Sequence, residues 1–274
     1  MTRIDLRLGI CTIQRDRGRW LAEWVAFHYA AGFRKFYIFL HRCTDNSEAV
    51  VRQLQKHFDI QCFVLGAEVQ RPQLAAYQHA YQSFGHEVDW MAFIDGDEFL
   101  FTPQSGDLRH VMGQYQYAKV SSLGAWWVCY GSSGHVTEPE GLIIENYQLR
   151  PPLSHLNNRH FKCIVRGHQG DSVSVGMNAH SFNTRYGTVD ELMRPLSVGY
   201  MPEIEPSYEQ LRINHYVCQS LEYFETFKQN SGMADAGSMA IRPREIWDRD
   251  NINDIHDPAA LRHLDEVKNL LKAT

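Results

Sequence analysis

The sequence predicts an α/β fold with a mostly parallel sheet and helices on both faces. Residues 7–101 alternate short apolar runs with stretches of helical spacing, which is the order of a doubly wound sheet. Residues 90–101, WMAFIDGDEFLF, form an apolar run that carries three acids. After residue 103 the apolar runs become shorter and richer in aromatic residues, which predicts a mixed second half.

The individual elements follow from periodicity and from residues that begin or end helices. The first half is expected to hold strands at 7–13, 35–40, 60–65 and 90–101, with helices at 20–31, 46–57 and 72–84. Gly32 ends the first helix, Asn46 or Ser47 caps the second, and Pro72 begins the third. The second half is expected to hold strands at 120–130, 161–165 and 173–177, helices at 219–229 and 258–272, and a flexible loop at 231–240.

Composition excludes several classes of function. A formal net charge of -5 argues against nonspecific nucleic-acid binding. The six cysteines are scattered without a Cys-x-x-Cys pair, which predicts reduced core residues and no disulfide frame or zinc site. Neither G-x-G-x-x-G nor a Walker lysine loop is present. No apolar run reaches the roughly 18 residues of a membrane span, so we expect a cytoplasmic protein, at most in peripheral contact with the inner face of a membrane.

The acids at 95–98 are the strongest indication of function. Asp95 and Asp97 project to one side of an extended chain, and Gly96 between them lets a diphosphate or a metal approach the backbone. Carboxylates at the end of a buried strand suit Mn²⁺ or Mg²⁺ bound to phosphates. The alternative is a solvated acidic turn, but acids within so apolar a run need a partner.

Several separated blocks resemble the bacterial members of glycosyltransferase family 92 and closely related family-2-like groups. They are EWVAFHYAAGF at 23–33, CTDNS at 43–47, the block at 90–101, YGSSGH at 130–135 and INHYVCQSLEYFETFKQNSG at 213–232. The resemblance implies the GT-A fold and an inverting, metal-dependent transfer of a sugar. The donor would be a nucleotide-diphosphate sugar, UDP-linked, and the acceptor a glycan or glycolipid of a bacterial surface polysaccharide. This chain has Gln14-Arg15-Asp16 where the family usually has Lys-Asn-Glu.

The resemblance also implies roles for single residues. The metal ligands would be Asp97, Asp95, which could instead meet the ribose, His215 from the second half of the chain, and His180 as a second choice. A histidine in a strand is otherwise commonly structural. Arg15 and Asp45, at the ends of the first two strands, and Gln73, at a helix start, are placed to meet the nucleotide sugar, as is Asp95. Lys162 and Lys228 could neutralise phosphate as point charges. The alternatives are a surface arginine, a helix-capping acid and two solvated lysines.

The acceptor side is predicted from aromatic residues beside a glycine-rich loop. Trp126 and Trp127 precede that loop, which contains Ser132 and Ser133, and a tryptophan there suits stacking on a sugar. Core packing explains one of the two tryptophans. The general base of an inverting transfer stays open between three candidates, Glu98, Glu145 and His135.

The domain division and two alternative functions complete the predictions. Residues 1–232 are predicted to form the GT-A domain, with a donor-binding half at 1–103 and an acceptor-side half at 104–232, followed by a C-terminal loop and helix extension at 233–274. The alternatives are a metal-dependent phosphohydrolase, for which further motifs are missing, and a catalytically silent sugar-binding domain.

Overall fold

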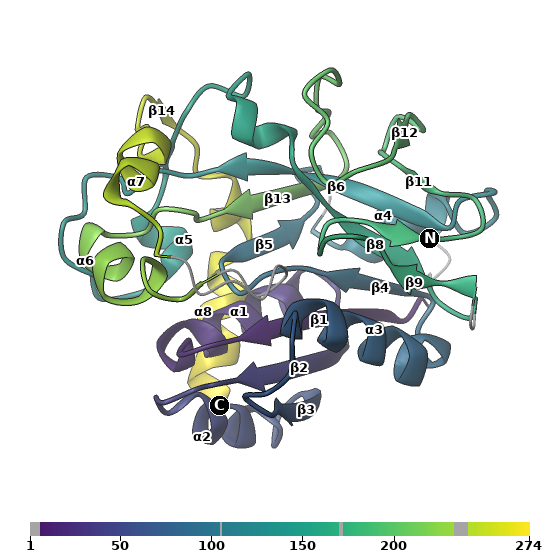
Figure 1. Ribbon diagram of the computed structural model, residues 1–274, viewed down its shortest axis with the longest axis horizontal. Helices are drawn as coiled ribbons and strands as arrows, with labels where there is room; N and C mark the ends of the chain where they lie inside the picture. The colour runs from purple at the N-terminus through teal and green to yellow at the C-terminus, as the bar shows by residue number, and fades with distance from the viewer. Residues whose placement is uncertain (1–5, 105, 170–171, 233–240) are drawn as a thin grey trace.

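The computed structural model describes residues 6–104, 106–169, 172–232 and 241–274. Its main sheet begins with four parallel strands in the order β3-β2-β1-β4 (Figure 1). Their bounds are Leu8–Gln14 for β1, Lys35–His41 for β2, Asp59–Leu65 for β3 and Trp90–Phe93 for β4. The predicted mostly parallel α/β class is confirmed, because the strands of the first half run in one direction and bring their carboxyl ends to one edge.

Alternating side chains divide the core between the two faces of this sheet. The first face packs against the helices α1 (Gly18–Ala30), α2 (Ser47–Leu54) and α8 (Leu264–Ala273) through residues such as Ile10, Phe36 and Trp90. The second face packs against α3 (Pro72–Phe84) through residues such as Cys11 and Met91. Burial on both faces explains why these strands read as continuous apolar runs.

The predicted strand at 90–101 is wrong as a single element. The chain forms β4, then a turn at residues 95–97, and then β5 (Glu98–Phe101). The backbone N–H of Glu98 donates to the carbonyl of Asp95 over 3.2 Å and closes that turn. We call residues 95–97 the acidic turn. Ile94 alone separates it from β4, so the acids do reach the carboxyl edge of the sheet, as expected.

The second half of the chain is mixed, as predicted. β8 (Phe161–Arg166) pairs antiparallel with both β4 and β6 (Ser122–Cys129), and β6 also pairs parallel with β11 (Thr188–Val189), which in turn pairs with β12 (Pro195–Leu196). β13 (Arg212–His215) lies between β5 and β6, antiparallel to the first and parallel to the second. Two small ladders join β9 (Ser174–Val175) to β10 (Phe182–Asn183) and β7 (Leu149–Arg150) to β14 (Ile255–His256). Short helices α4 (Leu108–Gln114) and α5 (Ile143–Asn146) connect these strands.

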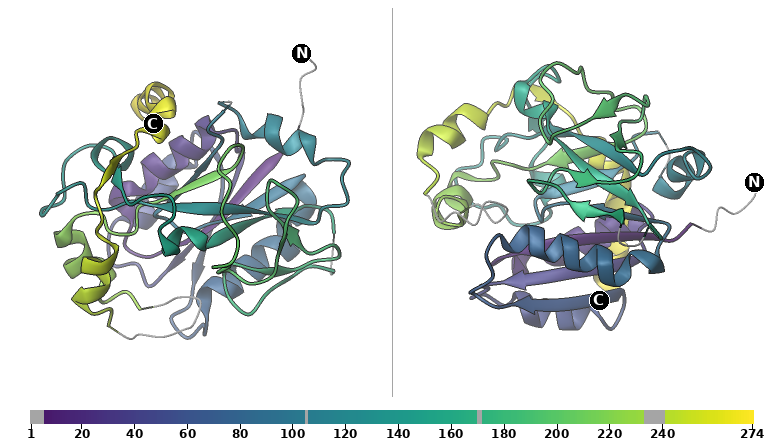
Figure 2. Two further views of the ribbon diagram at one scale, coloured as in Figure 1. Left: turned by 90° about the horizontal axis from the view of Figure 1, so that it is seen from above. Right: turned by 45° about the vertical axis from the view of Figure 1, so that its right-hand side comes forward.

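The C-terminal segment folds back onto the first half. α8 lies beside α1 (Figure 2), and Val267 is buried in the same core as α1. The predicted helix at 219–229 is a short helix α6 (Leu221–Tyr223) followed by a π-helical turn at Phe224–Lys228. Farther along lie α7 (Arg244–Asp250) and a 3₁₀ turn at Ala259–His263. Most of the predicted loop at 231–240 lies outside the described residues.

Two further expectations concern cysteines and membrane spans. All six cysteines are free thiols, as predicted, and four of them are buried. Among the helices that the structure describes, none combines the length and the hydropathy that a membrane span requires.

Candidate active site

A large cavity opens at the carboxyl ends of β1, β2 and β4. Its volume is about 920 Å³, and we call it the strand-end cavity. Seven arginine or lysine residues and five aspartate or glutamate residues line it within the described chain: Arg15, Arg17, Arg42, Arg71, Lys228, Arg242 and Arg249, and Asp16, Glu68, Asp95, Asp97 and Asp250. The excess of cations favours an anionic ligand.

Three loops at the rim of this cavity have unusual backbone conformations. Asp16, Arg42 and Arg71 have φ values of 50°, 53° and 48° without being glycine, and each lines the cavity. They follow β1, β2 and β3 in turn. Non-glycine residues in the left-handed region store local strain, which commonly concentrates at functional sites.

Asp95 is held by three side chains from two elements. The ammonium of Lys162, from β8, lies 2.9 Å from Oδ2, while Gln73 and Tyr77, from α3, donate to Oδ1. Burial opposes ionisation of this carboxyl, but Lys162 outweighs it and lowers the pKa of Asp95. Asp95 is therefore an anion whose oxygens already have donors. Gln73, which was predicted to meet the donor, lines the cavity and also fixes Asp95.

Glu98 lies beneath the acidic turn, fully buried. Its Oε2 accepts the backbone N–H of Asp95 over 3.0 Å, and its Oε1 lies 3.8 Å from Lys162. Burial, helped by the negative charges of Asp95 and Asp97, outweighs Lys162 and raises the pKa of Glu98 well above its usual range. This candidate base therefore supports the turn through the backbone N–H of Asp95, and it does not line the cavity.

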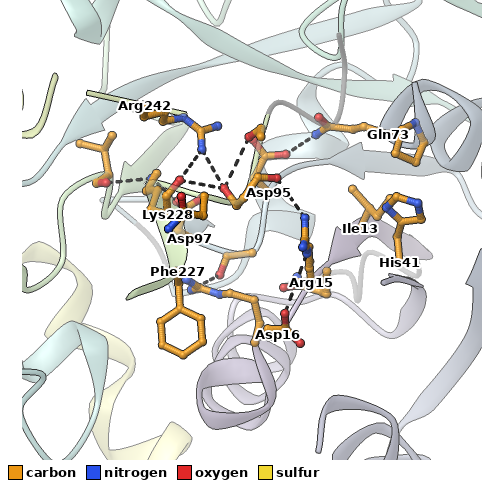
Figure 3. A pocket seen from close by; sticks show the side chains of 18 of the residues that line it. Ile13, Arg15, Asp16, His41, Gln73, Asp95, Asp97, Phe227, Lys228 and Arg242 are labelled. Carbon is orange, nitrogen blue, oxygen red and sulfur yellow. Dashed lines mark hydrogen bonds and ion pairs between the residues drawn. The ribbon is translucent and has the colours of Figure 1, made fainter. Parts of the chain in front are cut away.

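Asp97 faces the cavity beside Lys228 (Figure 3), and His215 lies near the other oxygen of its carboxylate. Nζ of Lys228 lies 2.7 Å from Oδ2, and Nε2 of His215 lies 3.7 Å from Oδ1. Burial opposes ionisation of Asp97, but Lys228 and His215 outweigh it and hold its pKa well below the usual range. His215 packs against Trp127 with ring centroids 4.1 Å apart.

Asp97 and His215 fit one divalent cation as a pair. Their nearest atoms, a carboxylate oxygen and an imidazole nitrogen, lie close enough for one ion to bridge, and both residues line the cavity. Mg²⁺ and similar ions commonly take their other ligands from substrate phosphates and water. Asp95 does not join this pair, because its oxygens are occupied by Lys162, Gln73 and Tyr77.

The predicted set of four metal ligands is not assembled. Nδ1 of His180 lies 2.9 Å from the carbonyl oxygen of Phe161, burial lowers its pKa to about 3, and the residue does not line the cavity. In the described chain, the group of three potential ligands within 4.8 Å of one another is instead Asp16, Cys43 and Asp45. The carboxylate of Asp16 accepts the backbone N–H groups of Thr44 and Asp45 there, so it stabilises the loop that follows β2.

Of two residues that were predicted to contact the nucleotide, Arg15 lies at the cavity and Asp45 does not. Arg15 lines the cavity, and its guanidinium donates to the carbonyl of Ser231 over 3.3 Å across the cavity. Asp45 does not line this cavity. Its carboxylate accepts the backbone N–H groups of Gly18 and Ser47 over 2.8 and 2.9 Å, at the starts of α1 and α2, so it acts as a cap.

Arg17 is a site residue that the sequence did not reveal. Its guanidinium donates to the carbonyl of Gly96 over 2.9 Å and also to Gln219 and Tyr223 from the second half. A Cβ at Gly96 would lie 2.1 Å from the side chain of Gln14. The glycine therefore gives room to Gln14 as well as to a ligand, and Arg17 holds the turn in place.

The acceptor-side predictions divide between the two faces of β6. Trp127 lines the cavity and stacks on His160 with ring centroids 4.8 Å apart, whereas Trp126 is buried in the core on the other face. Ser132 and Ser133 do not line the cavity. The hydroxyl of Ser133 accepts two backbone N–H groups at 148 and 149, so these serines shape the loop.

The two other predicted bases lie away from the cavity. Glu145 pairs with Lys268 over 2.6 Å, and Nε2 of His135 lies 3.2 Å from the carbonyl oxygen of Asn146. Asp250, at the end of α7, does line the cavity and is buried. Asn157 donates to it over 2.8 Å, and Arg249 also pairs with it. The sequence did not single out Asp250, which lies among the alternating charges of RPREIWDRD.

The structure thus combines a mostly parallel α/β sheet with a cation-rich cavity and an acidic turn at the carboxyl ends of its strands. Comparison of the sequence is more specific. The chain belongs to glycosyltransferase family 92, whose profile matches residues 6–254. The resemblance of the sequence blocks is thereby confirmed, and the observed sheet agrees with the GT-A fold expected from it.

Similar proteins occur in plants. Glycosyltransferase family 92 protein Os08g0121900 of Oryza sativa subsp. japonica is 24% identical over 218 residues, which is 79% of this chain and 34% of that protein. RCOM_0530710 of Ricinus communis is 26% identical over 219 residues, or 79% and 36% of the two chains. This chain thus spans about a third of the length of these relatives.

Solved structures offer a partial likeness. A crystal structure of S. aureus TarS 1-349 aligns with a TM-score of 0.39 and 12% identity, over 59% of this chain and 47% of that one. Glucosyl-3-phosphoglycerate synthase from Mycobacterium tuberculosis, in complex with Mn²⁺, UDP and phosphoglyceric acid, aligns with a TM-score of 0.31 and 9% identity, over 45% and 44% of the two chains. These values are too low to transfer a binding site.

Proposed function

We propose that this chain transfers a sugar from a nucleotide-diphosphate donor, UDP-linked, to a hydroxyl group of a glycan or glycolipid. Membership of glycosyltransferase family 92 supports the reaction class. The observation that carries the proposal is the acidic turn on the wall of a cavity with an excess of cations. A diphosphate would meet Lys228, Arg15 and Arg242 there, and charged hydrogen bonds of this kind favour a diphosphate leaving group.

The proposal includes a divalent cation, Mn²⁺ or Mg²⁺, held by Asp97 and His215. When bound, such an ion supplies Lewis-acid stabilisation of the charge that develops on the leaving diphosphate. Residues of this chain position the carboxylate that would bind the ion. Asp97 is kept ionised by Lys228 and His215, and Arg17 and Glu98 hold the turn that carries it.

For an inverting transfer we propose Asp250 as the carboxylate that accepts the acceptor's proton. It lines the cavity on the wall of the second half, as do Trp127 and His160, whose stacked rings suit a sugar face. Asp250→Asn is expected to lower transfer by roughly 10²-fold or more while leaving UDP binding unchanged. Equal losses of transfer and of UDP affinity would remove this role.

Calorimetry of UDP binding tests the donor proposal. UDP is expected to bind more tightly with Mn²⁺ than with a chelator, and equal affinities would exclude the metal. Release of UDP from UDP-sugars distinguishes a transferase from the alternatives. Inorganic phosphate as the product would indicate the phosphohydrolase. UDP-sugar binding without turnover would indicate a silent sugar-binding domain.

A further inference from the structure

Lys228 is placed at the cavity by an unusual piece of backbone. It ends the π-helical turn at Phe224–Lys228, in which the N–H of Gln229 donates to the carbonyl of Phe224 over 2.8 Å. The carbonyl of Lys228 in turn accepts Arg242 over 2.7 Å. Single π turns within helices are rare and occur frequently at functional sites. Two hydrogen bonds therefore fix the backbone around Lys228, one within the π-helical turn and one from Arg242.

The ammonium of Lys228 is committed to the carboxylate proposed as a metal ligand. It donates to Oδ2 of Asp97 over 2.7 Å and to the carbonyl of Val217 over 2.8 Å (Figure 3). The side chains of Lys228 and Asp97 are 16% and 13% exposed, so water screens the pair weakly. An ammonium has three N–H donors, of which these contacts use two, and Lys228 lines the cavity.

A metal ion on Asp97 would lie beside this fixed positive charge. Oδ1 of Asp97 faces His215, and Oδ2 of the same carboxylate faces Lys228. Two cations a few ångströms apart in a poorly solvated site repel each other strongly. A diphosphate removes the conflict, because its oxygens can accept the ammonium and ligate the metal at once.

We propose that Lys228 makes the binding of a divalent cation depend on the nucleotide. The inference rests on the proposed function. Without a diphosphate, Lys228 neutralises Asp97 and repels the ion. With a diphosphate bound, the ammonium of Lys228 donates to a phosphate oxygen, and Asp97 and His215 bind the divalent cation. By linkage, the ion strengthens nucleotide binding by the same factor.

The test measures binding of Mn²⁺ alone and in the presence of saturating UDP. Lys228→Met removes the charge without adding a metal ligand, and Lys35→Met, at a half-buried lysine paired with Glu87 and Asp59 outside the cavity, is the matched control. Lys228→Met is expected to bind Mn²⁺ alone roughly tenfold more tightly than wild type or more. The gain in Mn²⁺ affinity that UDP provides should shrink by a similar factor.

Several outcomes decide the matter. Asp97→Asn combined with Lys228→Met should lose the gained Mn²⁺ affinity, which ties the gain to Asp97. Mn²⁺ binding to Lys228→Met no tighter than to wild type would overturn the inference, and so would the same gain in Lys35→Met. The wild-type protein also tests the inference without any variant. If it binds Mn²⁺ with equal affinity in the presence and absence of UDP, the proposed dependence of metal binding on the nucleotide is wrong. UDP binding in that experiment would leave the proposed donor intact, whereas no UDP binding under any condition would end both proposals.

Discussion

Replacing Lys162 by methionine should destabilise the protein strongly, although Lys162 does not line the cavity. The side chain of Lys162 is 1% exposed, and its ammonium pairs with Asp95 over 2.9 Å. Removing one partner of a buried ion pair costs about 3–5 kcal/mol, and the 32% exposure of Asp95 favours the lower end of that range. For a chain of this size 1 kcal/mol shifts the melting temperature by about 2–4 °C. Lys162→Met should therefore melt roughly 6 °C or more below wild type.

The loss of stability in Lys162→Met should depend on pH in a defined direction. In wild type Lys162 keeps the folded pKa of Asp95 below its unfolded value, so the contribution of Asp95 is present at neutral pH and is lost only in acid. Without Lys162, burial and the charge of Asp97 would raise that pKa above the unfolded value. The variant then gains stability on acidification, and its deficit should shrink as the pH falls from 7 to about 4, near the unfolded pKa of an aspartate.

Thermal melts by circular dichroism at both pH values measure the effect, with Lys35→Met as the control. Lys35 is 28% exposed in its ion pairs and should cost no more than about 1 kcal/mol. A melting temperature of Lys162→Met within about 2 °C of wild type would refute the reasoning. So would a deficit that is the same at both pH values, because the charge of Asp95 would then play no part.

Three more outcomes are expected. Asp97→Asn should retain the fold and lower sugar transfer by roughly 10²-fold or more, and unchanged turnover would remove Asp97 from the site. His215→Ala should lower the melting temperature, because the ring is buried against Trp127, and should also abolish the Mn²⁺ contribution to stabilisation by UDP. A retained Mn²⁺ contribution would restrict His215 to packing. Burial raises the pKa of Glu23 from 4.5 to about 7, so wild-type stability should fall as pH rises through that interval. Glu23→Gln should flatten this slope in denaturant titrations, and an equal slope in both proteins would contradict the assignment.

The first half of the fold was predictable because its signals are local. Apolar runs, Gly32 and Pro72 mark elements that form where the sequence places them. The acidic turn was visible for the same reason. The break between β4 and β5 was not, because both strands are apolar and the partner of β5 is β13, which is distant in the sequence.

The partners of the site residues could not be predicted, since they are distant in sequence. Lys162 and Lys228 lie 67 and 131 positions from the aspartates that they hold. Both were expected near phosphate, but their commitment to the acidic turn depends on tertiary structure. Core packing was expected to explain one of the two tryptophans, and in the structure Trp126 is buried in the core whereas Trp127 lines the cavity. Asp250 carries no local signal, because an acid in a charged helix is usually solvated.

The position of β13 has a consequence for how the molecule is made. Among the described strands, β5 pairs with β13, and Glu98 stands opposite His215 in that ladder. During synthesis, the strand that follows the acidic turn therefore waits for more than a hundred further residues before its hydrogen bonds can form. Such distant pairing slows folding and leaves apolar strand edges open to other chains in the meantime. The yield of folded protein on expression should accordingly depend on chaperones and on growth temperature, even though the folded core is well packed.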